Sequence, residues 1–134
     1  MQPSLRKIIG PIIWWTEGTR PRLDSRSNIR INTIDVTNTN PKIIKIFLEF
    51  FRKDIKIDEN RLKLQLQIHE GDDKLKMENY WSELTKIPKN RFNKTIIRPV
   101  GNKIGKSMGT CKIRYTDKKT LDKIINLLNN LIPD

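Results

Sequence analysis

One acidic residue closes an apolar segment near the start of the chain. Residues 10–18 read Gly-Pro-Ile-Ile-Trp-Trp-Thr-Glu-Gly, so Glu17 is the only charged side chain of the run. Burying a carboxylate is costly unless a cation meets it. Magnesium or manganese is such a cation, and magnesium completes its shell with phosphate oxygens and water. A metal held there would activate water for phosphodiester hydrolysis. Glu17 is therefore the candidate catalytic residue and metal ligand.

Two other interpretations of this acidic residue stay open. Glu17 could instead pair with Arg20 or Arg22 at the end of a helix. Asp24 and Asp35 follow within 20 residues and are candidates for secondary acids.

The charge balance points to a polyanionic partner. The chain has 134 residues with 27 Lys and Arg against 15 Asp and Glu, a formal net charge of +12. Such an excess repels itself and favours nucleic acid as partner. No apolar run approaches the roughly 20 residues of a membrane-spanning helix, so no membrane partner is expected.

Residues 61–69 give the clearest strand pattern. Leucines and an isoleucine occupy the even positions 62–68, and polar residues occupy the odd positions. Glutamine can form two hydrogen bonds to adenine in the major groove, and Arg or Lys can bond guanine. With two further strands, the candidate DNA contacts are Arg61, Lys63, Gln65, Gln67, His69, Lys94, Arg98, Lys112 and Arg114. The alternative is a solvated outer face of an antiparallel sheet, which needs no ligand.

Two basic loops are candidates for contacts to phosphates, which set affinity rather than sequence choice. They span residues 18–30 and 101–106 and are rich in basic residues. Their candidate residues are Arg20, Arg22, Arg26, Arg30, Lys103 and Lys106.

The single histidine and the single cysteine exclude several kinds of site. One His makes a histidine-based metal centre improbable, and one Cys excludes an internal disulfide and a cysteine-based zinc cluster. Cys111 shares the apolar parity of its predicted strand and is expected in the core. Reduced cysteine favours an intracellular setting, in the cytoplasm or the nucleoid.

The elements that would position these side chains follow from periodicity. Helices are predicted over 4–16, 41–53, 72–86 and from Asp117 onward, with a kink or a new start at Pro11. Strands are predicted over 28–37, 61–69, 92–99 and 109–116. Within 28–37 the apolar residues change parity, which predicts a bulge or a turn between two short strands. This order indicates one α+β domain over residues 1–134, with an antiparallel or mixed sheet and helices on one face.

The first helix resembles the motif of the LAGLIDADG homing endonucleases. Residues 13–18 (Ile-Trp-Trp-Thr-Glu-Gly) stand where that motif has Leu-Ile-Asp-Ala-Asp-Gly. Compact members of that family with a single motif have similar segments to those at residues 36–41, 80–82, 87–88 and 109–111. The resemblance implies an αββαββα unit with a curved sheet that binds the major groove, here with one extra helix at 72–86.

The resemblance also implies a working assembly. Glu17 would hold a divalent metal at the scissile phosphate, and the single motif would require a homodimer whose paired helices are lined by Ile12, Ile13 and Gly18. The expected function is therefore sequence-specific binding of double-stranded DNA, with metal-dependent cleavage by the homodimer. A non-catalytic DNA-binding regulator with the same fold and an RNA-binding protein are the alternatives.

Overall fold

The computed structural model describes residues 1–19, 22–23, 30–100 and 107–134, with backbone only at 22–23. Their elements follow one another as α1 (Pro3–Glu17), β1 (Arg22–Leu23), β2 (Arg30–Ile31), β3 (Thr33–Asn38), α2 (Pro41–Phe50), β4 (Lys63–His69), α3 (Lys74–Thr85), β5 (Ile96–Arg98), β6 (Thr110–Thr116) and α4 (Lys118–Leu131). A π-helical turn at Phe51–Ile55 and two 3₁₀ turns, at Glu59–Arg61 and Lys89–Arg91, fill the connections. The α+β class is confirmed.

The main sheet has four strands in the order β3-β6-β4-β5. β6 pairs antiparallel with both β3 and β4, whereas β4 and β5 run parallel. The parallel pair follows from α3, because a helix that crosses between two strands lets the second run in the direction of the first. The mixed sheet expected from the sequence is thus present, and β1 and β2 form a separate two-stranded ribbon.

The predicted strands at 28–37 and 92–99 differ from the observed ones. The first is broken at Asn32 into β2 and β3, as its change of apolar parity indicates. The second was predicted too long, since only Ile96–Arg98 form a strand. Pro99 ends it because proline has no N–H to give to a ladder. Phe92 makes only an isolated bridge to Leu64.

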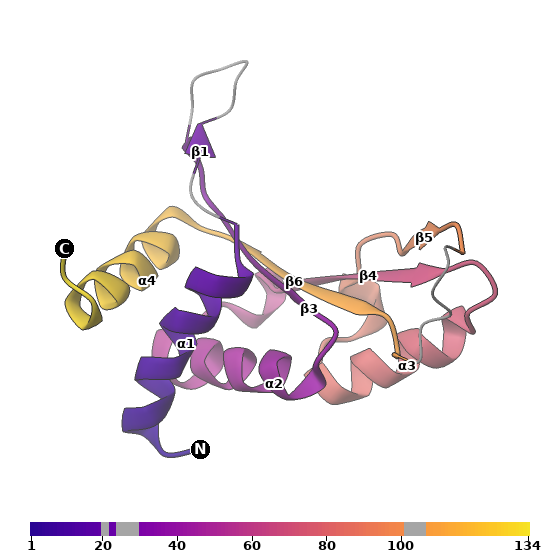
Figure 1. Ribbon diagram of the computed structural model, residues 1–134, viewed down its shortest axis with the longest axis horizontal. Coiled ribbons are helices and arrows are strands. Elements are labelled where there is room, and N and C mark those ends of the chain that lie inside the picture. The colour runs from indigo at the N-terminus through magenta and orange to yellow at the C-terminus, as the bar shows by residue number, and fades with distance from the viewer. Residues whose placement is uncertain (20–21, 24–29, 101–106) are drawn as a thin grey trace.

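The helices α1, α2 and α3 lie on one side of the sheet, and the ribbon that begins with β1 points to the other side (Figure 1). The core fills the space between sheet and helices. Its largest fully buried side chains are Trp81, Phe47, Phe50, Phe51, Ile34, Ile44, Leu62, Leu64, Leu66, Ile68, Ile87 and Ile113. One face of the sheet is therefore apolar and covered, as the alternation in 61–69 predicts.

α1 packs closely against α2 because residue 10 is a glycine. A Cβ on Gly10 would stand 2.2 Å from Cγ of Phe50. The helix continues through Pro11 as one element, so the new helix start predicted there is wrong. Gly10 and Pro11 are both buried, and the apolar run that holds Glu17 is thereby fixed against the core.

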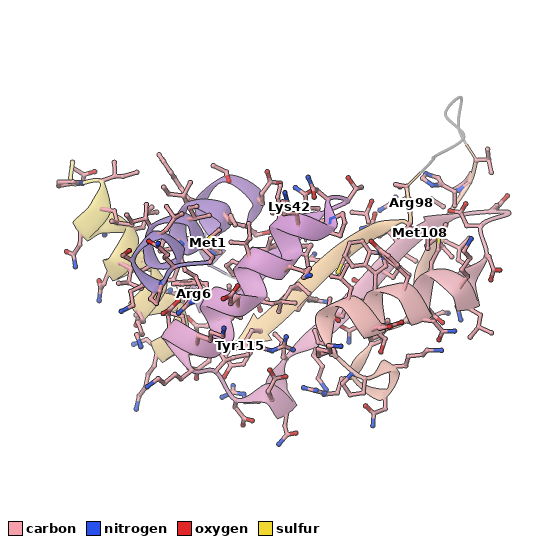
Figure 2. All side chains as sticks on the ribbon, turned by 90° about the horizontal axis from the view of Figure 1, so that it is seen from below. Met1, Arg6, Lys42, Arg98, Met108 and Tyr115 are labelled. Atoms are coloured by element: carbon pink, nitrogen blue, oxygen red, sulfur yellow. The ribbon has the colours of Figure 1, made fainter. Side chains whose placement is uncertain are left out.

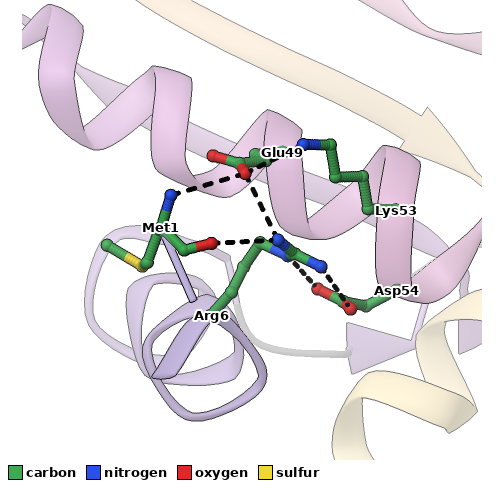
Figure 3. A network of polar contacts seen from close by, with 5 residues as sticks. All are labelled: Met1, Arg6, Glu49, Lys53 and Asp54. Carbon is green, nitrogen blue, oxygen red and sulfur yellow. Dashed lines mark hydrogen bonds and ion pairs between the residues drawn. The ribbon is translucent and has the colours of Figure 1, made fainter. Parts of the chain in front are cut away.

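A buried arginine ties α1 to the end of α2 (Figure 3). Arg6 is 6% exposed and donates from Nε and Nη2 to the two carboxylate oxygens of Asp54, at 2.6 and 3.0 Å. Its Nη1 donates to Glu49 Oε1 at 3.2 Å. The hydrogen bond to Asp54 raises the pKa of the Arg6 guanidinium, so this side chain stays charged. The carboxylates of Asp54 and Glu49 offset the cost of burying the charge of Arg6.

Helix starts agree with the sequence. Asn40 caps α2 by accepting from Lys42 N at 2.9 Å, and Pro41 occupies the first turn. Asp117 caps α4 by accepting from Thr120 N and Oγ1 at 3.0 and 2.7 Å. No helix of the described part of the chain is both long and apolar enough to cross a bilayer.

Candidate nucleic-acid interface

The uncovered face of the main sheet gathers polar side chains from all four strands. The register sets Lys63 opposite Arg114, Gln65 opposite Lys112, and Gln67 opposite Thr110. β3 adds Thr37 beside Lys112. β5 adds Arg98 beside His69. Because side chains on paired strands share a face when they are in register, the polar parity predicted for separate strands forms one continuous surface.

Five cations of this surface have no acidic partner. They are Lys63, Lys94, Arg98, Lys112 and Arg114, and none forms an ion pair with a described carboxylate. Other arginines of the described chain are neutralised, as Arg6 is by Asp54 and Arg52 is by Glu59. Like charges directly opposite across strands destabilise a sheet. Lys63 and Arg114 are such a pair, whereas on its other side Arg114 faces the carboxylate-bearing Asp35 of β3.

The two glutamines are oriented by neighbouring groups. Gln65 donates from Nε2 to the carbonyl oxygen of Lys94 at 3.0 Å. Gln67 accepts at Oε1 from Arg98 Nε at 3.2 Å. Each amide keeps further hydrogen-bonding capacity, since a glutamine side chain offers two donor hydrogens and an accepting oxygen.

His69 lies at the end of the same row with its side chain 48% exposed. Its backbone N donates to Asp72 Oδ2 at 2.8 Å, and its ring Nδ1 lies 4.0 Å from the same oxygen. The ring is thus available on the polar face, although a carboxylate stands beside it.

A hollow of about 510 Å³ opens where this face meets the start of β4. Its lining residues are Asn60, Arg61, Lys63, Asn93, Arg114, Tyr115 and Thr116. Arg61 donates to the carbonyl of Thr116, pairs with Asp117 at 3.5 Å and lies 5.5 Å from the centre of the Tyr115 ring. Arg61 is therefore held by its own chain, unlike the five unpaired cations.

Glu17 occupies the last position of α1, next to the edge strand β3. Gly18 forms an antiparallel bridge with Val36, and a Cβ on Gly18 would stand 2.7 Å from the carbonyl of Asp35. The carboxylate of Glu17 is half-exposed, and no described residue hydrogen-bonds or ion-pairs with it. A negative side chain at the carboxyl end of a helix is unfavourable without a cation nearby.

The second acid near this point is already engaged. Asp35 is 7% exposed, and its Oδ1 accepts from Thr19 N at 3.1 Å and from Thr19 Oγ1 at 2.7 Å. Among the described residues, no three His, Cys, Asp or Glu side chains gather as a metal site. The residues fit a divalent ion only as one carboxylate that shares it with a phosphate and water.

The predicted phosphate contacts divide into two groups. Arg20, Arg26, Lys103 and Lys106, the side chain of Arg22, and the candidate acid Asp24 lie outside the described residues. Arg30 is described and pairs with Asp122 of α4 at 2.7 Å, so its charge is already balanced.

The three residues expected at a dimer interface differ in exposure. Ile12 is half-buried, Ile13 is 8% exposed within the core, and Gly18 is half-buried and bridges to Val36 of β3. Part of the apolar face of α1 lies at the surface beside Ile12. Leu5 and Ile8 are 46% and 43% exposed and continue its line along α1. The spacing 5, 8, 12 places these three residues in one stripe along the helix.

Comparisons with protein-family models, with curated proteins and with solved structures found no match.

Proposed function

We propose that this protein binds double-stranded DNA through the open face of its four-stranded sheet. The observation that carries the proposal is the set of five unpaired cations. The register places Lys63, Arg98, Lys112 and Arg114 on one face, and the backbone of Lys94 lies beside Gln65 of the same face. Phosphate oxygens would neutralise these cations, and releasing condensed counterions from DNA would supply the free energy.

Sequence preference would come from the side chains between these cations. A pair of adjacent strands, such as β4 and β6, fits the major groove. A glutamine side chain can form hydrogen bonds to both N6 and N7 of adenine. Gln65 and Gln67 stand in alternate positions of β4, and each is held by one hydrogen bond that leaves other groups for a base edge. This arrangement supports direct readout in addition to binding by charge.

Cleavage of the DNA is a second candidate function, supported by the position of Glu17. Its carboxylate lies at the negative end of α1 with no partner among the described groups. A magnesium or manganese ion between this carboxylate and a DNA phosphate would supply Lewis-acid stabilisation and a metal-bound nucleophile.

One such acid serves one strand, so cutting both strands would require two copies of the chain. A symmetric homodimer places the same patch of each copy against the other. The stripe of Leu5, Ile8 and Ile12 on α1 supports that contact. A regulator that binds DNA without cutting it would use the same sheet, and Glu17 would have no catalytic role.

Binding is tested by selecting duplexes from a randomised pool and measuring the anisotropy of the selected duplex, a scrambled duplex and an RNA duplex at the same salt. We expect the selected DNA to bind more tightly than both others. The deep, narrow major groove of RNA cannot admit a ribbon. Equal binding of the RNA duplex would refute recognition through the DNA major groove.

Cleavage is tested with the selected site cloned in a supercoiled plasmid, with magnesium or manganese. The nuclease proposal predicts nicking that Glu17→Gln abolishes and that Glu83→Gln, a matched change on the exposed surface of α3, leaves intact. Binding without nicking in either metal would leave the regulator as the function. The binding proposal would survive that outcome.

A further inference from the structure

A second groove lies on the helix side of the molecule, away from the open face of the sheet. It has a volume of about 890 Å³ and is lined by residues of α2 and α3 and of the segments beside them. Seen from below, α2 lies between α1 and α3, and Lys42 marks its first turn (Figure 2). This groove contains none of the residues used in the DNA proposal.

The floor of the groove is apolar. Ile46 of α2 and Tyr80 and Leu84 of α3 contribute side chains that are only half-buried. The ring of Tyr80 packs edge-on against Trp81 with centroids 5.3 Å apart, which fixes its position. Half-exposed apolar side chains along two adjacent helices are the floor that an amphipathic helix needs.

The rim of the groove is cationic. Lys42, Lys45 and Lys86 are exposed, and none pairs with a carboxylate of the described chain. The only acid in the lining is Glu49, which accepts from Arg6 and from Lys53, both at 3.2 Å. The hydrogen bond from Lys53 lowers the pKa of Glu49, so this acid is already neutralised by cations.

We propose that this groove binds an acidic amphipathic helix of a protein partner. Its apolar residues, spaced three and four apart, would cover Ile46, Tyr80 and Leu84, and its Asp or Glu residues would meet the lysines of the rim. α2 and α3 have 10 and 12 residues, so the groove accommodates about three turns.

The apolar floor favours a peptide over nucleic acid. A duplex presents phosphates to a basic groove but has no apolar side chains to cover such a floor. Charge alone would explain the lysines, whereas only an amphipathic partner uses both the lysines and the floor. Because the groove and the sheet face are on separate sides, the partner and DNA would bind at the same time.

The test uses a fluorescein-labelled synthetic peptide of about 14 residues, with leucines at helical spacing and glutamates on the flanks. A scrambled peptide of the same composition keeps the charge and loses the stripe. We expect the amphipathic peptide to bind the full chain at least about tenfold more tightly than the scrambled one, because only it can cover the floor.

Two double variants with the same change in charge locate the site. Lys42→Glu with Lys45→Glu should weaken the peptide about tenfold, since two attractions become repulsions. Lys76→Glu with Lys123→Glu changes exposed positions outside the groove. This variant should weaken the peptide only slightly, through the lower net charge of the protein. Leu84→Glu places a charge in the floor and should also abolish binding, with circular dichroism to verify folding.

Three results would overturn the proposal. Equal binding of the scrambled peptide would reduce the groove to a charged surface. Equal losses in the two double variants would place the peptide elsewhere. If Lys42→Glu with Lys45→Glu instead weakened duplex DNA and left the peptide unaffected, DNA would be the occupant.

Discussion

The dependence of DNA affinity on salt is the sharpest consequence of the unpaired cations on the sheet. For B-DNA, the logarithm of affinity falls with the logarithm of salt concentration with a slope of about −0.9 per neutralised phosphate. Five described cations on the face then give a slope of about −4.5. Raising salt from about 50 to about 200 mM should weaken binding about 500-fold.

Removing two of these cations should change the slope by a calculable amount. In the double variant Lys112→Gln with Arg114→Gln, three of the five cations remain, and the slope should become shallower, at about −2.7. The same change in salt should then weaken binding only about 40-fold. Neither side chain makes a described hydrogen bond or ion pair, so the variant should fold. It also removes the like-charge pair Lys63 and Arg114.

The assay is an anisotropy titration of a labelled duplex at several salt concentrations. Lys42→Gln with Lys45→Gln is the matched control, because it removes the same charge from the helix side. The control should keep the wild-type slope. A double variant on β6 with an unchanged slope, or a control with an equally reduced one, would refute the assignment of DNA to the sheet face.

Four further predictions concern the parts that hold the interface in place. Gly10→Ala should destabilise the fold by about 1–3 kcal/mol, measured by urea unfolding, because its Cβ would meet the Phe50 ring; unchanged stability would contradict the close packing of α1 on α2. Asp117→Ala should cost about 0.5–2 kcal/mol through loss of the α4 cap. Hydrogen bonds from Thr120 lower the pKa of Asp117. Wild type should therefore be more stable than Asp117→Asn above the ordinary aspartate pKa of about 3.9. This difference in the free energy of unfolding should vanish as pH falls through the lower pKa of the folded state, and a difference that persisted in acid would refute this. Burial raises the pKa of the Cys111 thiol, so a thiol reagent should modify it only at the rate of unfolding, and rapid labelling of the native protein would contradict a buried cysteine.

Local patterns in the sequence predicted the elements well because they depend on neighbouring residues. The alternation in 61–69 identified both faces of β4, and Asn40 before Pro41 marked the start of α2. The same parity argument assigned Lys112 and Arg114 to the polar side of β6. The register then joined these rows into one surface.

Features that depend on distant residues could not be predicted. The pairing of β5 with β4 in parallel requires the path of α3, which periodicity does not give. Arg6 meets Asp54, 48 residues away, and a charge near the start of a helix gives no sign of such a partner. The small size of Gly10 matters only because Phe50 lies against it.

The orientation of α1 shows the same limit at the candidate site. Its residues are apolar nearly all round, so the sequence does not indicate which face is inside. The structure turns Ile13 and Trp14 into the core and leaves Leu5 and Ile8 at the surface. The predicted pairing of Glu17 with Arg20 or Arg22 falls on side chains outside the described part of the chain.

The most direct test of DNA recognition by the sheet is a map of backbone amide shifts on adding duplex DNA. With the isotope-labelled protein and the selected duplex, of about two helical turns, the largest changes should fall in residues 63–69 and 110–116. Changes confined to α2 and α3, or spread evenly over the basic surface, would contradict the central claim that the open face of the sheet holds DNA.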